Sequence, residues 1–199
     1  VPDLMEVVEP SVFHLEYAPE AIISFGQGCE GEPSLQGDLI ADSIAAIRKK
    51  TKKGTININT NAGSRPNMKK IVEAGIDSMR ISLFSAVPEH YATYHRPQNF
   101  TFADVKKNAK MAHQAGVALS INLLAYPGFS DREQEIDALL SFVRECGIGL
   151  IQIRNLNIDP NFFDEHFPGE ESYGMLDFLS ILQKELPEVK IGNYSKPLR

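Results

Sequence analysis

AIISFGQGCEGEP (residues 21–33) is the stretch that organises the fold: the apolar run Ala21–Phe25 leads directly into a glycine-rich, acidic loop. An apolar run of this length bounded by glycine is typical of a buried strand in a parallel sheet. Glycine lets the backbone approach a ligand closely, and the strand before it holds the loop in place. The loop carries Glu30 and Glu32 but no lysine. It is therefore better suited to a bound ammonium group than to a phosphate.

Strand and helix signals alternate from this point to the C-terminus. Apolar or β-branched runs predict five firm strands and a weaker sixth: Ala21–Phe25, Thr55–Asn59, Ser78–Phe84, Val117–Leu124, Ile148–Ile153 and Val189–Gly192. Helical periodicity fills the intervals, as in Asp131–Cys146, where Ser130 and Glu133 predict a capping box and Gly147 a C-terminal stop. Strands joined by helical crossovers run parallel in one sheet. Val7–Tyr17 fits either a helix or a strand.

The predicted fold is therefore α/β, with residues 1–199 forming a single domain around a parallel sheet with alternating helices. These strands are too few for a closed eight-stranded barrel. An incomplete barrel that lacks its first strand agrees better with the pattern. The strand Ala21–Phe25 would then be an unpaired edge, across which residues 1–20 fold or through which two copies form a homodimer.

Composition excludes several classes of protein. A net charge of −6, from 20 basic and 26 acidic residues, argues against a general nucleic-acid surface. Two cysteines are too few for a secreted disulfide framework, and we find neither a signal peptide nor an apolar run of membrane-spanning length. We expect a cytoplasmic protein without a membrane partner. The chain starts at Val1 rather than at a methionine, which suggests a piece of something longer.

Polar side chains follow each firm strand, and ligands of parallel α/β folds bind at the carboxyl ends of strands. The segments at these ends are rich in serine and asparagine: Gly26–Pro33, Asn59–Asn61, Ser82–Ser85, Asn122–Tyr126 and Arg154–Asn157. Such groups recognise a ligand by hydrogen bonding rather than by proton transfer. No histidine has a second ligand at metal spacing and no Ser-His-Asp set is evident, so we assign neither a metal site nor a catalytic residue. The protein is expected to hold a group that carries the chemistry.

Two interpretations of the glycine loop compete. Gly26, Gly28 and Gly31 match the spacing of the dinucleotide-binding fingerprint, which favours a nucleotide- or dinucleotide-dependent oxidoreductase. Three features weigh against it. The carboxylates of the loop would repel a pyrophosphate, Pro33 delays the helix that should point at it, and the next strand ends in Asn59-Thr60-Asn61 without the acid that binds a ribose.

The second interpretation is a resemblance to a known family. Residues 30–33, Glu-Gly-Glu-Pro, resemble the Gly-Gly-Glu motif of the radical S-adenosylmethionine (SAM) enzymes, which often continues into proline. Residues 59–61, 79–83 and 122–128 resemble the next three strands of that family, so that the likeness spans roughly residues 20 to 157. The resemblance implies a partial (β/α)6 barrel in which the motif binds the methionyl ammonium of SAM.

The resemblance also implies roles for individual residues. Glu30, Gly31, Glu32 and Pro33 form the motif, with Gly31 and Glu32 at the ammonium. Further members of the implied cofactor site are Asn59, Ser82 and Asn122, the last two at the ribose or carboxylate, and Arg154, which faces the substrate.

Two departures from the family pattern stand out. The first glycine of the motif is Glu30 here, and the three-cysteine motif that anchors a [4Fe-4S] cluster is absent. Cys29 and Cys146 cannot replace it, because three closely spaced thiolates are needed. If the resemblance holds, the cluster ligands belong only to the intact protein, upstream of Val1.

The sequence thus predicts the SAM- and substrate-binding core of a radical SAM oxidoreductase, inactive alone, acting on a small molecule or a peptide. The dinucleotide-dependent oxidoreductase and a non-catalytic binding scaffold are the alternatives.

Overall fold

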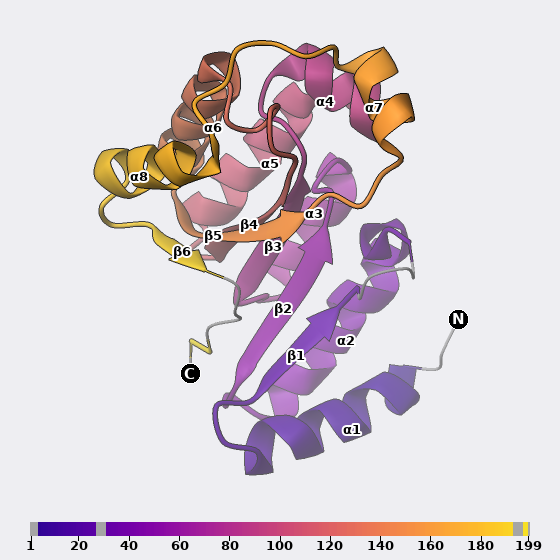
Figure 1. Cartoon of the computed structure of the whole chain (residues 1–199). Helices are drawn as coiled ribbons and strands as arrows, with labels where there is room; N and C mark the ends of the chain where they lie inside the picture. Colours follow the sequence, from indigo (N-terminus) through magenta and orange to yellow (C-terminus); the bar gives the residue numbers. More distant parts are fainter. Residues whose placement is uncertain (1–3, 27–30, 193–196, 199) are drawn as a thin grey trace.

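The computed structural model describes residues 4–26, 31–192 and 197–198 of the chain, and its centre is a six-stranded parallel sheet in the order β1-β2-β3-β4-β5-β6 (Figure 1). Its strands are β1 Ile22–Phe25, β2 Thr55–Thr60, β3 Ser78–Leu83, β4 Ala118–Ala125, β5 Ile148–Asn155 and β6 Lys190–Gly192. Each predicted strand is confirmed, with small differences at the ends. The order follows the chain, so each connection is one crossover between neighbours.

Helices fill the connections and cover one face of the sheet. They are α1 Leu4–Tyr17, the 3₁₀ turn η2 Pro33–Gln36, α2 Gly37–Lys50, α3 Arg65–Glu73, α4 Pro88–His95, α5 Phe102–Gln114, α6 Glu133–Cys146, α7 Pro160–His166 and α8 Met175–Glu185. Helices α2, α3, α5, α6 and α8 contact one another in that order and form the outer layer of a partial barrel (Figure 1). The ambiguous segment Val7–Tyr17 is helical, and α1 packs against α2 and β1.

The strands are apolar on the face toward the helices and polar on the other. Their helix-facing side chains are fully or almost fully buried and form the main core: Ile56, Ile58, Met79, Ile81, Leu83, Leu119, Ile121, Leu123 and Ile151. The opposite face carries Asn57 and Asn59 on β2, Arg80 on β3 and Gln152 on β5. Successive side chains of a strand point to opposite faces. The concave side of this open sheet is therefore a polar surface available to a ligand.

The predicted C-terminal end of the helix 131–146 is confirmed, but its predicted N-terminal capping box is wrong. Gly147 ends α6 in the left-handed conformation, with φ +67°. The predicted capping box of Ser130 and Glu133 does not form, because α6 starts after Arg132 and the Ser130 hydroxyl accepts from the Tyr126 amide at 2.9 Å. Ser130 closes the turn after β4 instead.

β1 lies at one edge of the sheet, and among the described strands only β2 pairs with it. This agrees with an incomplete barrel, and the predicted homodimer through this edge stays a prediction. None of the described helices combines the length and the apolar character that crossing a membrane requires.

Candidate functional site

A polar cavity of about 350 Å³ lies at the carboxyl ends of the strands. Its lining comes from the loop after β1 and from β2, β3, β4 and β5: Gly26, Gly31, Glu32, Pro33, Asn59, Thr60, Asn61, Arg80, Ser82, Asn122, Gln152 and Arg154. Ligand pockets in proteins span about 300–1,000 Å³, so this cavity accommodates a ligand of cofactor size. We call it the rim cavity.

Glu32 is the acid that lines the rim cavity among the described residues, and the end of β2 holds it in place. Its Oε1 accepts from the Thr60 hydroxyl at 2.5 Å and from the Ser34 amide at 3.0 Å, while Oε2 accepts from the Asn61 amide at 2.7 Å. The carboxylate therefore faces the strand ends and caps η2 at the same time. A carboxylate offers about four acceptor positions, so one remains for a ligand donor.

Gly26 allows the loop to turn back over the sheet. Its φ is +80°, and a Cβ there would lie 2.7 Å from both the Asn59 carbonyl oxygen and Pro33 Cγ. The side-chain nitrogen Nδ2 of Asn59 donates to the Gly26 carbonyl at 2.5 Å, which ties the ends of β1 and β2 together. Gly31, with φ +82°, has nothing within 4 Å of a would-be Cβ. The backbone at Gly31 is therefore sterically accessible.

A chain of hydrogen bonds fixes the polar face below the rim cavity. Asn57 Nδ2 donates to the Ser24 hydroxyl at 2.7 Å and to Asn59 Oδ1 at 3.1 Å. The Ser78 hydroxyl donates to Asn57 Oδ1 at 2.8 Å. These amides satisfy one another across β1, β2 and β3, as buried polar groups must. They support the rim cavity rather than presenting free groups to a ligand.

Asn122 differs from these residues. Its Oδ1 is buried and has no hydrogen-bond partner among the described residues. On β4 it lies beside Ser82 of β3 and Gln152 of β5 in the strand register. An unsatisfied buried acceptor is costly, and in a cavity lining it is expected to receive a ligand donor.

Two arginines contribute the positive charge of the rim cavity. Arg80 is half-buried at the centre of the concave face, whereas Arg154 is exposed near the end of β5. Burial lowers the pKa of Arg80, and the nearby positive charge of Arg154 lowers it further. Asp159, the acid that follows β5, caps α7 by accepting from the Asn161 and Phe162 amides.

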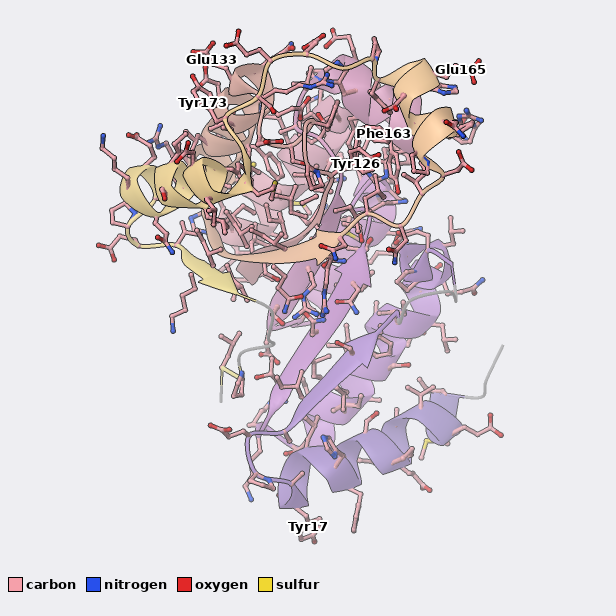
Figure 2. All side chains as sticks on the ribbon, viewed as in Figure 1. Tyr17, Tyr126, Glu133, Phe163, Glu165 and Tyr173 are labelled. Atoms are coloured by element: carbon pink, nitrogen blue, oxygen red, sulfur yellow. The ribbon has the colours of Figure 1, made fainter. Side chains whose placement is uncertain are left out.

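A buried aromatic cluster attaches the loop after β5 beside the rim cavity. It consists of Phe84, Phe129, Phe163 and Phe167, from the ends of β3 and β4 and from the α7 region. Tyr126 stacks on Phe163 with ring centroids 3.9 Å apart (Figure 2). Helix α7 is thus held by apolar burial.

Next to the cluster, Glu135 binds two polar groups. Its carboxylate accepts from the Ser85 hydroxyl at 2.6 Å and contacts His90 Nδ1 at 2.5 Å. Burial raises the pKa of Glu135, whereas these two hydrogen bonds act in the opposite direction. The acid lies between the serine and the histidine, so the trio links α4 to α6 and does not form a nucleophilic triad.

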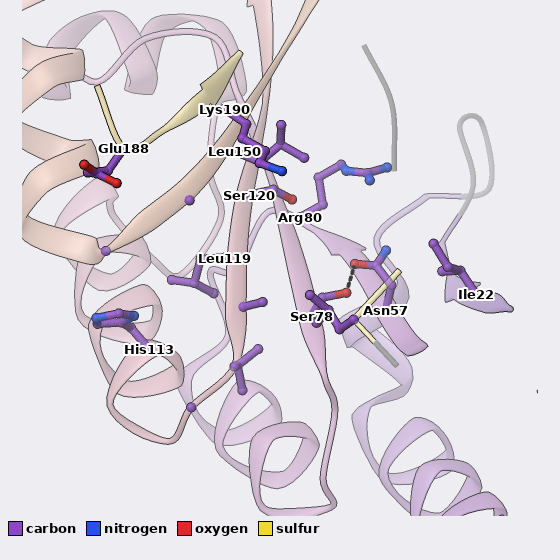
Figure 3. A pocket seen from close by; sticks show the side chains of 16 residues that line it. Ile22, Asn57, Ser78, Arg80, His113, Leu119, Ser120, Leu150, Glu188 and Lys190 are labelled. Carbon is purple, nitrogen blue, oxygen red and sulfur yellow. Dashed lines mark hydrogen bonds between the residues drawn. The ribbon is translucent and has the colours of Figure 1, made fainter. Parts of the chain in front are cut away.

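A second cavity, of about 460 Å³, opens on the concave face at the opposite ends of the strands (Figure 3). Asn57, Ser78, Arg80 and Ser120 line it together with apolar residues such as Leu150 (Figure 3). Arg80 belongs to the lining of both cavities.

The structure brings most of the residues nominated from sequence into one place. Gly31, Glu32, Pro33, Asn59, Ser82, Asn122 and Arg154 all line the rim cavity. Glu30 lies outside the described residues, and the role of the others as SAM ligands stays a prediction. Thr60 and Asn61 belong to a strand end at which the sequence predicts a ligand, whereas Arg80 and Gln152 were not nominated from the sequence. Strict alternation of polar and apolar residues in strand 78–83, Ser-Met-Arg-Ile-Ser-Leu, is the signal that would have identified Arg80.

The fold and the site define a class: an open, partial parallel α/β barrel with a polar ligand cavity at the carboxyl ends of its strands. The model of the Radical SAM superfamily matches residues 17–140, and the chain belongs to this superfamily.

Two curated relatives are similar to part of the chain. The chain is 29% identical over 151 residues to the GTP 3',8-cyclase of Acaryochloris marina (strain MBIC 11017), covering 71% of this chain and 44% of the cyclase. It is 34% identical over 95 residues to the probable GTP 3',8-cyclase of Methanosarcina acetivorans, covering 46% of this chain and 28% of that protein. The chain thus spans less than half the length of either relative.

Methylornithine synthase superposes with a TM-score of 0.67 at 14% identity, over 94% of this chain and 54% of that one. The SAM-bound structure of SuiB from Streptococcus suis gives a TM-score of 0.63 at 14% identity, over 96% of this chain and 43% of that one. These structures show the same fold and confirm the predicted partial barrel.

The superfamily implies SAM and a [4Fe-4S] cluster. The described residues of this chain fit SAM but offer no ligands for the cluster. The rim cavity offers the acceptors that SAM needs, because Asn122 Oδ1 is unsatisfied and Glu32 retains an acceptor position. The cluster has no such match. Cys146 is buried on α6, and its burial raises the thiol pKa to about 11. No cluster of three or more histidine, cysteine or acidic residues suited to a metal occurs in the described part of the chain.

Proposed function

We propose that this chain is the SAM- and substrate-binding core of a radical SAM enzyme. The observation that carries the proposal is the rim cavity, in which Glu32, Ser82 and Asn122 converge from three elements of a radical SAM fold. When bound, SAM supplies the chemistry of this superfamily, a 5′-deoxyadenosyl radical that removes a hydrogen atom from a substrate.

The residues of this chain bind and orient the cofactor. The Glu32 carboxylate and the backbone at Gly31 accept from its ammonium, a charge-assisted hydrogen bond of the stronger kind. Ser82 and Asn122, adjacent in the strand register, face its ribose or carboxylate, and Asn59 and Pro33 shape the loop beneath. Because these groups are already fixed by the sheet, little reorganisation is needed on binding.

Cleavage of SAM requires a cluster whose thiolates this chain does not contain, since its sequence holds only Cys29 and Cys146. We propose that the chain alone binds SAM and is inactive, and that the cluster-bearing segment belongs to the intact protein. We expect that protein to be a cytoplasmic oxidoreductase acting on a small molecule or a peptide.

The rival function, dinucleotide binding, meets an obstacle at Glu32. A dinucleotide places its pyrophosphate at the N-terminus of the helix after the glycine loop. Here the Glu32 carboxylate occupies that position and accepts from the Ser34 amide. A second negative charge at the same place would be repelled.

Calorimetric titration of the purified protein with SAM and, separately, with NAD distinguishes these functions. We expect saturable binding of SAM and weaker binding in Ser82→Ala, with Ser180→Ala as the matched control on the exposed face of α8. Tight NAD binding without SAM binding would support the oxidoreductase instead. A scaffold without a ligand would bind neither.

A further inference from the structure

We propose that the turn at the end of β2, residues 60–63, fixes the orientation of the Glu32 carboxylate, and that Thr60 and Asn108 are positioning residues for the ammonium group of SAM. Thr60 acts on the carboxylate directly, whereas Asn108 acts from helix α5 through the backbone of the turn. This inference rests on the proposed function, because it names the residues that hold one of the proposed ligands of SAM in place.

The start of the turn binds both carboxylate oxygens of Glu32. Oε1 accepts from the Thr60 hydroxyl at 2.5 Å, and Oε2 accepts from the Asn61 amide at 2.7 Å. Two bonds to separate oxygens fix the plane of a carboxylate as well as its position. A hydroxyl carries a single proton, so the Thr60 hydroxyl, which donates to Glu32, cannot also donate to a ligand. Its contribution to binding is therefore made through Glu32.

The backbone of the turn is held in an uncommon conformation. Ala62 is fully buried and has a φ of +55°, in the left-handed region that residues with a Cβ rarely adopt. Its amide donates to Thr60 Oγ1 at 3.0 Å, and the Gly63 amide donates to Asn61 Oδ1 at 2.8 Å. Such a conformation persists only where the surrounding structure imposes it, and residues of this kind cluster at ligand sites.

Asn108 supplies part of this restraint from the helix layer. It is a fully buried residue of α5, and its Nδ2 donates to the Ala62 carbonyl at 2.8 Å. Its Oδ1 has no hydrogen-bond partner among the described residues. An unsatisfied buried oxygen is costly, and a leucine at this position would have none. The asparagine is therefore explained by the bond that it donates to the turn.

A continuous series of hydrogen bonds thus joins α5 to the acid of the rim cavity. Asn108 lines neither the rim cavity nor the second cavity, so its effect on a ligand passes through the turn. Loss of either positioning residue leaves the charge of Glu32 in place but frees the carboxylate to rotate. Ordering that group again on binding lowers the affinity for an ammonium.

Calorimetric titration with SAM and with 5′-methylthioadenosine, which lacks the arm that carries the ammonium, tests the inference. Thr60→Val keeps the shape of the side chain and should weaken SAM binding about tenfold, as expected for one lost hydrogen bond to a charged group. Asn108→Leu should weaken it about threefold or more, because it removes a neutral hydrogen bond. Thr60→Ser restores the hydroxyl and should recover most of the affinity. Binding of methylthioadenosine should change less than about threefold in each variant.

Thr55→Val is the matched control. Thr55 is a fully buried threonine at the opposite end of β2, and its hydroxyl accepts from the Leu198 amide at 2.8 Å. This variant removes a buried hydroxyl from the same strand without touching Glu32, and it should bind SAM as the parent protein does.

Amide hydrogen exchange, measured by NMR in the free protein, tests the positioning without any ligand. The Ser34 and Asn61 amides both donate to Glu32. Their exchange should be about tenfold faster in Thr60→Val and in Asn108→Leu than in the parent protein and in Thr55→Val.

The two measurements separate this inference from the proposed function. Faster exchange in a protein that does not bind SAM would refute the proposed function and leave the positioning of Glu32 standing. Normal SAM binding and normal exchange in both variants would overturn the inference alone. Equal losses of affinity for SAM and methylthioadenosine would overturn it too, since the damage would then not be specific to the ammonium. So would weaker SAM binding without faster exchange, because Thr60 would then be a direct ligand.

Discussion

Asn122→Leu is the substitution for which stability and ligand binding should change in opposite directions. The Asn122 Oδ1 atom is buried without a hydrogen-bond partner among the described residues, in the lining of the rim cavity. A buried unsatisfied polar group costs about 1–3 kcal/mol, and an apolar group of similar shape removes that cost. We therefore expect the variant to unfold with an unchanged or larger free energy, by up to about 2 kcal/mol.

The same variant should bind SAM more weakly. A ligand donor that loses its acceptor inside the cavity forfeits about 1–3 kcal/mol, or roughly 5- to 150-fold in Kd. Urea denaturation measures the stability, and calorimetry measures the affinity. Asn161→Leu, at an exposed position of α7, is the control and should leave the affinity unchanged. Unchanged SAM binding in Asn122→Leu would refute the assignment of this side chain to the ligand. A clear loss of stability would refute the claim that Oδ1 has no partner in the free protein.

Three further predictions concern the loop and the buried ionisable groups. Gly26→Ala should destabilise the protein more than Gly31→Ala, by about 1–3 kcal/mol as measured by urea denaturation. Both glycines have a positive φ, but only at Gly26 would a Cβ lie 2.7 Å from the Asn59 carbonyl oxygen and from Pro33. Burial lowers the pKa of His95 to about 4, so as the pH falls the imidazole is protonated in the unfolded chain before it is protonated in the folded protein. The free energy of unfolding should therefore fall by about 2 kcal/mol between pH 7 and 5. His95→Gln should remove most of this dependence on pH. Burial raises the pKa of the Cys146 thiol to about 11. In a Cys29→Ser variant, iodoacetamide should therefore modify Cys146 only after the protein unfolds. Rapid labelling of the native protein at pH 8 would contradict this burial.

Local patterns were sufficient for the six strands and for the helices between them, but not for Val7–Tyr17, which fitted either a helix or a strand and is part of helix α1. Each apolar run has the length of a strand and is separated from the next by a helical period, so a parallel sheet follows from chain connectivity alone. The glycine loop is predicted to bind a ligand for a related reason. A strand that ends in glycine and acids at a carboxyl edge has few other uses.

Capping details were less predictable. Ser130 and Glu133 have the spacing of a capping box, yet the Ser130 hydroxyl accepts a hydrogen bond from the Tyr126 amide and closes the turn after β4. A spacing rule does not distinguish between two nearby donors. The same competition explains why Ser, Asn and Asp predict a turn or a cap without selecting one.

What the sequence determined by itself is therefore the class of fold and the family, because these depend on periodicity and short motifs. The loop that would receive a ligand is a prediction from the same short motifs. Only the tertiary structure decided how the charges are distributed. It turned Glu32 toward Thr60 and Asn61, 28 and 29 positions away, and placed Arg80 and Arg154 in one cavity from strands that are not neighbours. Such contacts depend on the strand register and the curvature of the sheet. Both are set by the packing of the whole fold, so no short stretch of sequence predicts them.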